Sequence, residues 1–221
     1  MTKHKVPEFT TFASLLRMAT KYGFSDVREA LVEDLKGAYP TKWEDFEAAR
    51  VLGENVFGSP RPHHNAVLNL FLEQNINFAL PFAAYRATLG GLPALVSDTP
   101  GVVLPRLHLA AIIHGMGAMK RVTMLATHNF VYVGDLEACP DTSCILHVRV
   151  NPARGRREAL NKLFNAMLIG SEADMLSPPS LGTLACAGCT TLLERAHLGF
   201  RKNIVWAGLP SLLGWGGWGS V

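Results

Sequence analysis

Residues 12–35 read FASLLRMATKYGFSDVREALVEDL, and their apolar pattern decides the fold class at this end of the chain. Apolar residues first recur at the i, i+3, i+4, i+7 spacing of one helical face: Phe12, Leu15, Leu16 and Ala19. Tyr22-Gly23 interrupts the pattern, because glycine suits the position just past a helix end. Apolar residues then recur every four positions: Val27, Leu31 and Leu35. The stretch predicts a helical hairpin with an apolar inner face.

The composition of the chain predicts a folded protein with a substantial core. Of its 221 residues, 48% are hydrophobic and only 18% are charged, which argues against wholesale disorder. Its net charge of +3 is small, so a strongly basic nucleic-acid binder would need a concentrated patch. The best candidate for such a patch is Arg154, Arg156 and Arg157, which is also the pattern of a solvated helix face.

No segment predicts secretion or a membrane span. Residues 1–8 are polar and lack an apolar signal core. The longest apolar stretch, residues 76–96, is interrupted by Pro81, Arg86, Gly90, Gly91 and Pro93. A central arginine costs about 2.5–3.5 kcal/mol on membrane-insertion scales, so we interpret this stretch as a buried helix pair. We expect a cytoplasmic or nuclear location, where thiols stay reduced.

Helical patterns continue along the chain, and strand patterns are scarce. Helices are predicted over residues 42–52, 65–73, 78–89, 153–168 and 181–213. Residues 104–133 predict one or two helices with a break near Gly115 and Gly117, and residues 145–150 a short strand or extended linker. The fold class is therefore mostly α, an irregular helical array or bundle with at most a short strand pair. We divide it into residues 1–53 and 54–221, or treat both as one continuous domain.

All four cysteines fall in two short pairs, Cys139-x4-Cys144 and Cys186-x2-Cys189. In a reducing compartment, two close pairs are more typical of a zinc tetrathiolate than of disulfides. Such a site would join the irregular loop after residue 135 to the start of the last helix. It would be structural, because four protein ligands leave no open coordination position.

Two alternatives to zinc stay open. Cysteines are often small, buried thiols with no partner. Cys186-Ala187-Gly188-Cys189 also has the spacing of a redox motif, although such a motif needs an upstream strand that the sequence does not show. His197 lies eight residues after Cys189, roughly 12 Å along a helix, so both cannot reach one ion. His128 or His147 would be the better substitute ligand.

No catalytic motif is present in the sequence. It lacks G-x-S-x-G, H-E-x-x-H, a Walker A loop and a complete G-x-G-x-x-G. The acidic residues near Glu33 and Glu44 have the pattern of solvated helix faces. We therefore predict that the protein is not an enzyme. The alternative function is a zinc-stabilised nucleic-acid-binding regulator that uses Arg154, Arg156, Arg157, Arg201 and Lys202.

Three segments together resemble a known family. The hairpin motif Leu15-Leu16-x-x-Ala19-x-Lys21-Tyr22 resembles the last two helices of a BTB/POZ domain, in particular those of filamentous fungi. Ala38-Tyr39-Pro40-Thr41, with Trp43 and Phe46, is similar to the region that follows that domain. The segment 201–211, RKNIVWAGLPS, with Trp215 and Trp218 after it, resembles the closing segment of the same proteins.

The resemblance implies a non-enzymatic protein-interaction or scaffold protein, related to ubiquitin-ligase substrate adaptors. It covers the end of the BTB domain and the helical region after it, whereas the BTB sheet and the surface through which BTB domains dimerise have no counterpart in the sequence. We expect protein partners, no membrane and no nucleic acid. A homodimer stays an open question, because the BTB dimer surface has no counterpart here.

Overall fold

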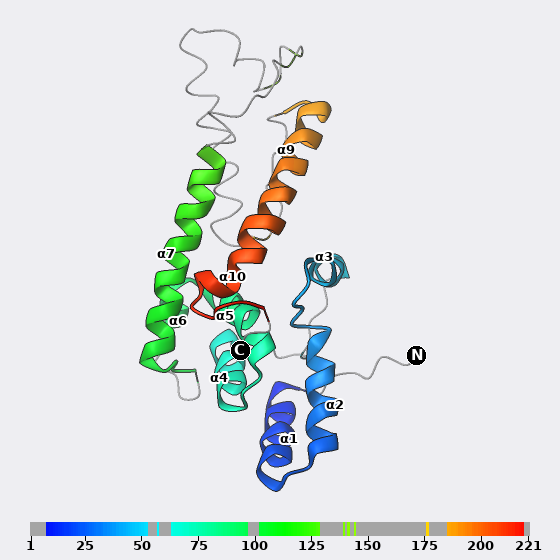
Figure 1. Cartoon of the computed structure of the whole chain (residues 1–221), viewed down its shortest axis with the longest axis vertical. Coiled ribbons are helices and arrows are strands. Elements are labelled where there is room, and N and C mark those ends of the chain that lie inside the picture. Colours follow the sequence, from blue (N-terminus) through cyan, green and yellow to red (C-terminus); the bar gives the residue numbers. More distant parts are fainter. Residues whose placement is uncertain are drawn as a thin grey trace. The chain divides into compact units, whose positions relative to one another are not determined.

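The structure is a computed structural model of the whole chain, drawn in Figure 1. It describes residues 8–52, 57, 63–96, 102–128, 139, 141, 144, 176 and 185–218. Every regular element in these ranges is a helix, which confirms the predicted mostly α fold class. The chain forms two compact units: unit 1 is Met1–Gly115 with Leu209–Val221, and unit 2 is Met116–Gly208. A domain boundary at residue 53 stays a prediction.

The hairpin predicted over residues 12–35 is present as α1 (Phe9–Tyr22) and α2 (Ser25–Lys36). Gly23 ends α1 with φ of 70°, in the left-handed region that glycine adopts without strain. The backbone N–H of Phe24 then donates to the carbonyl oxygen of Ala19 at 2.9 Å, closing the helix end. One glycine therefore turns the chain back within two residues.

The inner face of the hairpin differs from the predicted one at two positions. Leu16 and Leu35 are fully buried, as predicted, but Leu15 is 41% and Val27 is 48% exposed. Leu15 lies about 100° around the helix from Leu16, which places it at the edge of the buried stripe. A spacing of four residues also drifts by about 40° at each step, and this drift carries Val27 out of the stripe formed by Leu31 and Leu35.

The remaining helices at the start of unit 1 agree with the sequence patterns, except for the short helix at residues 91–95, which lies outside the predicted helix of residues 78–89. They are α3 (Trp43–Leu52), α4 (His64–Glu73), the 3-10 turn η1 (Asn77–Ala79), α5 (Leu80–Thr88) and α6 (Gly91–Leu95). The single helix predicted over residues 78–89 is thus η1 followed by α5. Pro81 lies in the first turn of α5, where its missing N–H removes no helical hydrogen bond.

Aromatic rings fill the core of unit 1. Tyr39 packs edge-on against Phe71, with ring centroids 4.7 Å apart, and Phe46 packs in the same way against Phe82 at 5.6 Å. Such edge-to-face pairs add to the free energy gained by burying each ring. Burial also raises the pKa of Tyr39 to about 12, although the charge of Arg86 acts to lower it. Tyr39 therefore stays neutral in the core.

Helix α7 (Arg106–His128) is continuous, so the helix break predicted near Gly115 and Gly117 is wrong. Gly115 serves another purpose, because the carbonyl oxygen of Leu212 lies too close for a Cβ atom at this position. The side chain of Leu213 would lie 2.8 Å from the same Cβ atom. Glycine thus permits the close approach of α10 (Ala207–Leu212) to α7 within unit 1.

The described part of unit 2 includes α9 (Ala187–Phe200) and the π-helical turn η4 (Arg201–Trp206), which leads into α10. These elements lie within the helix predicted over residues 181–213, and Pro210 is inside α10. Predicted elements over residues 145–150 and 153–168 lie outside the described residues. None of the described helices combines the length and apolar character needed to cross a membrane.

Candidate metal centre

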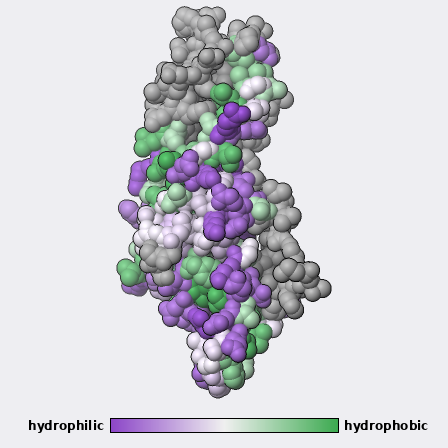
Figure 2. All heavy atoms as spheres, turned by 45° about the vertical axis from the view of Figure 1, so that its right-hand side comes forward, coloured by the Kyte–Doolittle hydropathy of each residue, from purple (hydrophilic) through white to green (hydrophobic). Residues whose placement is uncertain are grey.

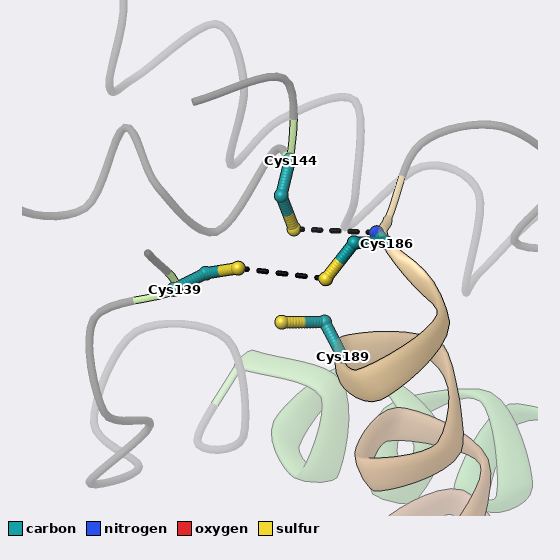
Figure 3. Close-up of side chains that lie close together, drawn as sticks. All are labelled: Cys139, Cys144, Cys186 and Cys189. Atoms are coloured by element: carbon teal, nitrogen blue, oxygen red, sulfur yellow. Dashed lines mark hydrogen bonds between the residues drawn. The ribbon is translucent and has the colours of Figure 1, made fainter. Parts of the chain in front are cut away.

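The structure brings the four predicted ligands together at the start of α9, in unit 2 (Figure 3). Cys186 is the N-cap residue of α9, with an extended backbone, and Cys189 lies in the first turn. Cys139 and Cys144 come from the chain well before that helix. The backbone N–H of Cys144 donates to the carbonyl oxygen of Asp141 at 3.1 Å, a turn between these two cysteines. None of these four cysteines forms a disulfide.

The four sulfur atoms point toward one common centre. They all lie within 4.8 Å of one another, and those of Cys139 and Cys186 are 3.5 Å apart. Zn–S bonds of about 2.3 Å in a tetrahedron require sulfur–sulfur distances of about 3.8 Å. The backbone N–H of Cys186 also donates to the sulfur of Cys144 at 3.4 Å. The site therefore needs only small side-chain adjustments to hold a tetrahedral ion.

The electrostatics of the four thiols favour a cation at their centre. A hydrogen bond from the backbone of Cys189, together with the thiol of Cys139, lowers the pKa of Cys186 to about 7. Desolvation, followed by the neighbouring thiols, raises the pKa of Cys189 well above its usual value. The pKa of Cys139 is also raised: a backbone hydrogen bond from Asp141 lowers it, but desolvation and the thiols of Cys186 and Cys144 outweigh that bond. One thiolate forms readily, and further thiolates need a positive charge to offset their repulsion.

Among the histidines weighed as ligands, the structure describes the side chain of His197 alone, and it does not join this group. Within the described residues, the group that could hold a metal ion is the four cysteines alone. His197 is buried in α9, and its Nδ1 atom has no hydrogen-bond partner in the described part of the chain. Burial, helped by the charge of Arg201, lowers the pKa of His197 to about 4. The side chain of His128 and all of His147 lie outside the described residues.

Arg201 does not contribute to a basic surface. It is only 4% exposed, and its Nη1 atom donates to the carbonyl oxygen of Leu176 at 2.6 Å. In this conformation its guanidinium is buried and bonded to backbone, so it presents no charge to a phosphate, and the predicted nucleic-acid contact stays a prediction. Lys202 is exposed. Arg154, Arg156 and Arg157 lie outside the described residues.

Unit 1 carries an exposed apolar surface that the sequence patterns did not predict. It lies on the outer side of the hairpin and consists of Leu15, Met18, Tyr22, Phe24 and Val27. The rings of Tyr22 and Phe24 are 6.2 Å apart, so the side chains on the two sides of the turn are continuous. Green apolar side chains reach the surface at the lower end of Figure 2, the end that the hairpin turn forms in Figure 1. We call these five residues the hairpin face.

A signal for the hairpin face is present in the sequence. Met18 and Tyr22 are large apolar residues at positions that the buried stripe of α1 does not use. A second apolar stripe on a helix of a small unit marks a surface that solvent does not favour.

No family model, no curated protein and no solved structure matches this chain. The resemblance to fungal BTB/POZ proteins therefore stays a prediction. The cysteine geometry and the hairpin face are the two features of the described residues that bear most directly on function.

Proposed function

We propose that Cys139, Cys144, Cys186 and Cys189 bind one structural zinc ion. The observation that carries this proposal is the convergence of all four sulfur atoms to within 4.8 Å. Soft thiolate ligands in a tetrahedral set select zinc over the hard cations magnesium and calcium, which prefer oxygen. Four cysteine ligands fill the coordination sphere, so the ion would stabilise the fold and leave no position for a substrate.

The positions of the ligands explain what such an ion would stabilise. Cys186 and Cys189 lie at the N-terminus of α9, where the helix dipole favours negatively charged thiolates. Cys139 lies 47 residues before Cys186 along the chain. An ion held between them would close this long loop, and it would fix the start of α9 against the segment that carries Cys139 and Cys144.

Metal analysis of the full chain, purified without chelator, tests the zinc site. We expect about one zinc per chain, and loss of most of it in Cys186→Ser. Thr191→Ala, one turn further along α9 and exposed, is the matched control and should keep its zinc. Cobalt loading should give the visible absorption of a tetrahedral thiolate complex in the wild type and in the control. A metal-free protein that melts as the zinc-loaded one does would contradict the proposal.

We further infer that the chain is a non-enzymatic protein-interaction or scaffold protein, as the resemblance to the C-terminal part of fungal BTB/POZ proteins implies. The hairpin face supports this inference. Four of its five side chains are about half exposed, and two of them, Tyr22 and Phe24, lie next to one another at the turn between α1 and α2. Contiguous apolar surface of this kind on a folded unit is typical of a protein–protein contact. A relation to ubiquitin-ligase substrate adaptors is the finer form of the same proposal.

Proximity labelling with the full chain tests the interaction function. A subset of labelled proteins should disappear when Met18 and Phe24 are both changed to glutamate. Leu107→Glu places one such charge on a separate exposed leucine and should leave that subset unchanged. Identical labelling by all three proteins would contradict a contact through the hairpin face. Turnover of a broad panel of small substrates at meaningful rates would contradict the non-enzymatic assignment.

A further inference from the structure

We propose that a peroxide oxidises the four-cysteine site to a disulfide between Cys139 and Cys186 and thereby releases its metal ion. The two chain segments that the ion joins would stay joined, now by a covalent bond. This inference rests on the proposed zinc site and concerns how that site is regulated.

The geometry places this pair in direct contact. The sulfur atoms of Cys139 and Cys186 are 3.5 Å apart and face one another across the site, as the dashed line in Figure 3 marks. A disulfide requires a sulfur–sulfur distance of about 2.05 Å. The remaining approach of about 1.5 Å is within reach of side-chain rotation at either cysteine.

Burial sets the order of the two reactions. Cys139 and Cys144 are 5% and 2% exposed, whereas Cys186 and Cys189 at the start of α9 are half-buried. A small oxidant in solution therefore meets the helix-borne cysteines first. Cys186 is the N-cap residue, and a helix N-terminus stabilises a thiolate there. We assign Cys186 as the thiolate that is oxidised first and Cys139 as the buried thiolate that then attacks the oxidised Cys186.

The chemistry balances with hydrogen peroxide as the oxidant. The Cys186 thiolate attacks one peroxide oxygen, the O–O bond breaks, and a sulfenic acid and hydroxide form. The Cys139 thiolate then attacks the Cys186 sulfur, the S–S bond forms, and a second hydroxide leaves. Two sulfur atoms lose two electrons in total, the peroxide gains two, and two protons from solvent convert the hydroxides to water.

The consequence for the site depends on the number of ligands that remain. Only Cys144 and Cys189 would still be available, and two thiolates do not satisfy a tetrahedral ion. The disulfide meanwhile closes the same loop between Cys139 and Cys186 that the ion closes. Oxidation would therefore exchange a metal cross-link for a covalent one. Metal removal by a chelator, in contrast, leaves no cross-link at all.

The test treats the zinc-loaded full chain with one equivalent of hydrogen peroxide. A chromogenic chelator monitors released zinc, and free thiols are then alkylated and the disulfide is mapped by mass spectrometry. We expect about one zinc released per chain, a Cys139–Cys186 link, and alkylated Cys144 and Cys189. The oxidised protein should also melt at a higher temperature than the reduced, metal-free protein. A Cys186–Cys189 link, or sulfinic acid without a link, overturns the proposal.

Two variants serve as a matched pair. Cys144→Ser keeps both reacting thiols and should form the Cys139–Cys186 disulfide. In Cys139→Ser, we expect Cys186 to form no disulfide within the same chain. If either variant fails to fold, the wild-type mapping still decides. Metal content and disulfide mapping are separate measurements, so a chain purified without zinc that still forms the link would sink the zinc site and not the pairing. A zinc-loaded chain that forms a different disulfide would contradict the Cys139–Cys186 pairing and leave the zinc site intact.

Discussion

Unit 1 and the described part of unit 2 differ in what their buried interiors contain. Unit 1 buries aromatic and aliphatic side chains, among them Phe12, Phe71 and Tyr85, each at most 1% exposed. Unit 2 also buries apolar side chains, among them Leu193, Val205 and Trp206, but it adds two buried cysteines and the polar side chains of His197 and Arg201. An apolar core gains stability from removing surface from water, whereas buried polar groups and thiols need specific partners. The two units should therefore fail under different treatments.

Metal removal should produce the largest difference between the units. Stripping the ion with a chelator leaves α9 without its anchor at Cys186 and Cys189, and structural zinc commonly supplies much of the folding free energy of a small unit. We expect the amides of α9 to lose hydrogen-exchange protection by orders of magnitude, while those of α4 change little. Hydrogen exchange read by mass spectrometry measures both helices in one sample. Equal loss in both would show that the units do not unfold separately.

A cavity in the aromatic core should have the reverse effect. Phe71 is fully buried and packs against Tyr39, so Phe71→Ala should cost about 3–5 kcal/mol in the free energy of unfolding of unit 1. The protection of α4 and α5 should fall, and zinc content should stay near one per chain. Leu107→Ala, at a side chain that is 80% exposed, should change stability by less than about 0.5 kcal/mol. Loss of zinc from Phe71→Ala would show that the metal site of unit 2 depends on the core of unit 1.

The two units also differ in how far the sequence predicts them. Periodicity predicted α1, α2 and α4 in unit 1, because a helix that buries one face repeats its apolar residues locally. The ligand set of unit 2 was predicted from the spacing of its cysteines. Close spacing favours a shared ion whatever the intervening fold.

Other features depend on residues that are distant in the sequence, and no local pattern carries them. Gly115 has the pattern of a helix break, and only the carbonyl of Leu212 shows why a helix needs glycine there. Arg201 has the pattern of a surface cation, and only Leu176 shows that it is buried. The pairing of Cys139 with Cys186 is likewise set by the folded chain, since each has a nearer neighbour in sequence.

Acid should weaken unit 2 through His197. Its pKa of about 4 in the folded chain lies below the unfolded value of about 6.5. Between these pH values the unfolded chain binds a proton at His197 and the folded chain does not. Stability is therefore complete above pH 6.5 and falls as pH drops toward 4, by about 3 kcal/mol in all. His197→Gln has no such proton and should lack this part of the pH dependence.

The measurement for His197 is the difference in unfolding free energy between the wild type and His197→Gln, recorded from pH 7.5 to 5. Acid also protonates the cysteine ligands, but both proteins share that effect and the difference removes it. Parallel stability curves would show that His197 is not held in its neutral form by the fold.

Removing a buried polar contact in unit 1 should have a smaller effect on the free energy of unfolding. Asn65 is fully buried, and its Nδ2 atom donates to the carbonyl oxygens of Ala94 at 2.9 Å and Leu95 at 3.2 Å, which ties α4 to the end of α6. Asn65→Ala leaves both carbonyls without this donor and should cost about 1–3 kcal/mol. Even an apolar core thus depends on a buried amide at one helix contact.

Asn69 supplies the matched control on the same helix. Its Nδ2 atom donates to the carbonyl oxygen of Val103 at 2.8 Å, but this contact is exposed, so water replaces the lost donor. Asn69→Ala should therefore cost less than about 1 kcal/mol. Denaturant titration of the two variants measures the difference. If Asn69→Ala proved as costly as Asn65→Ala, burial would not be the reason that the Asn65 contact stabilises unit 1.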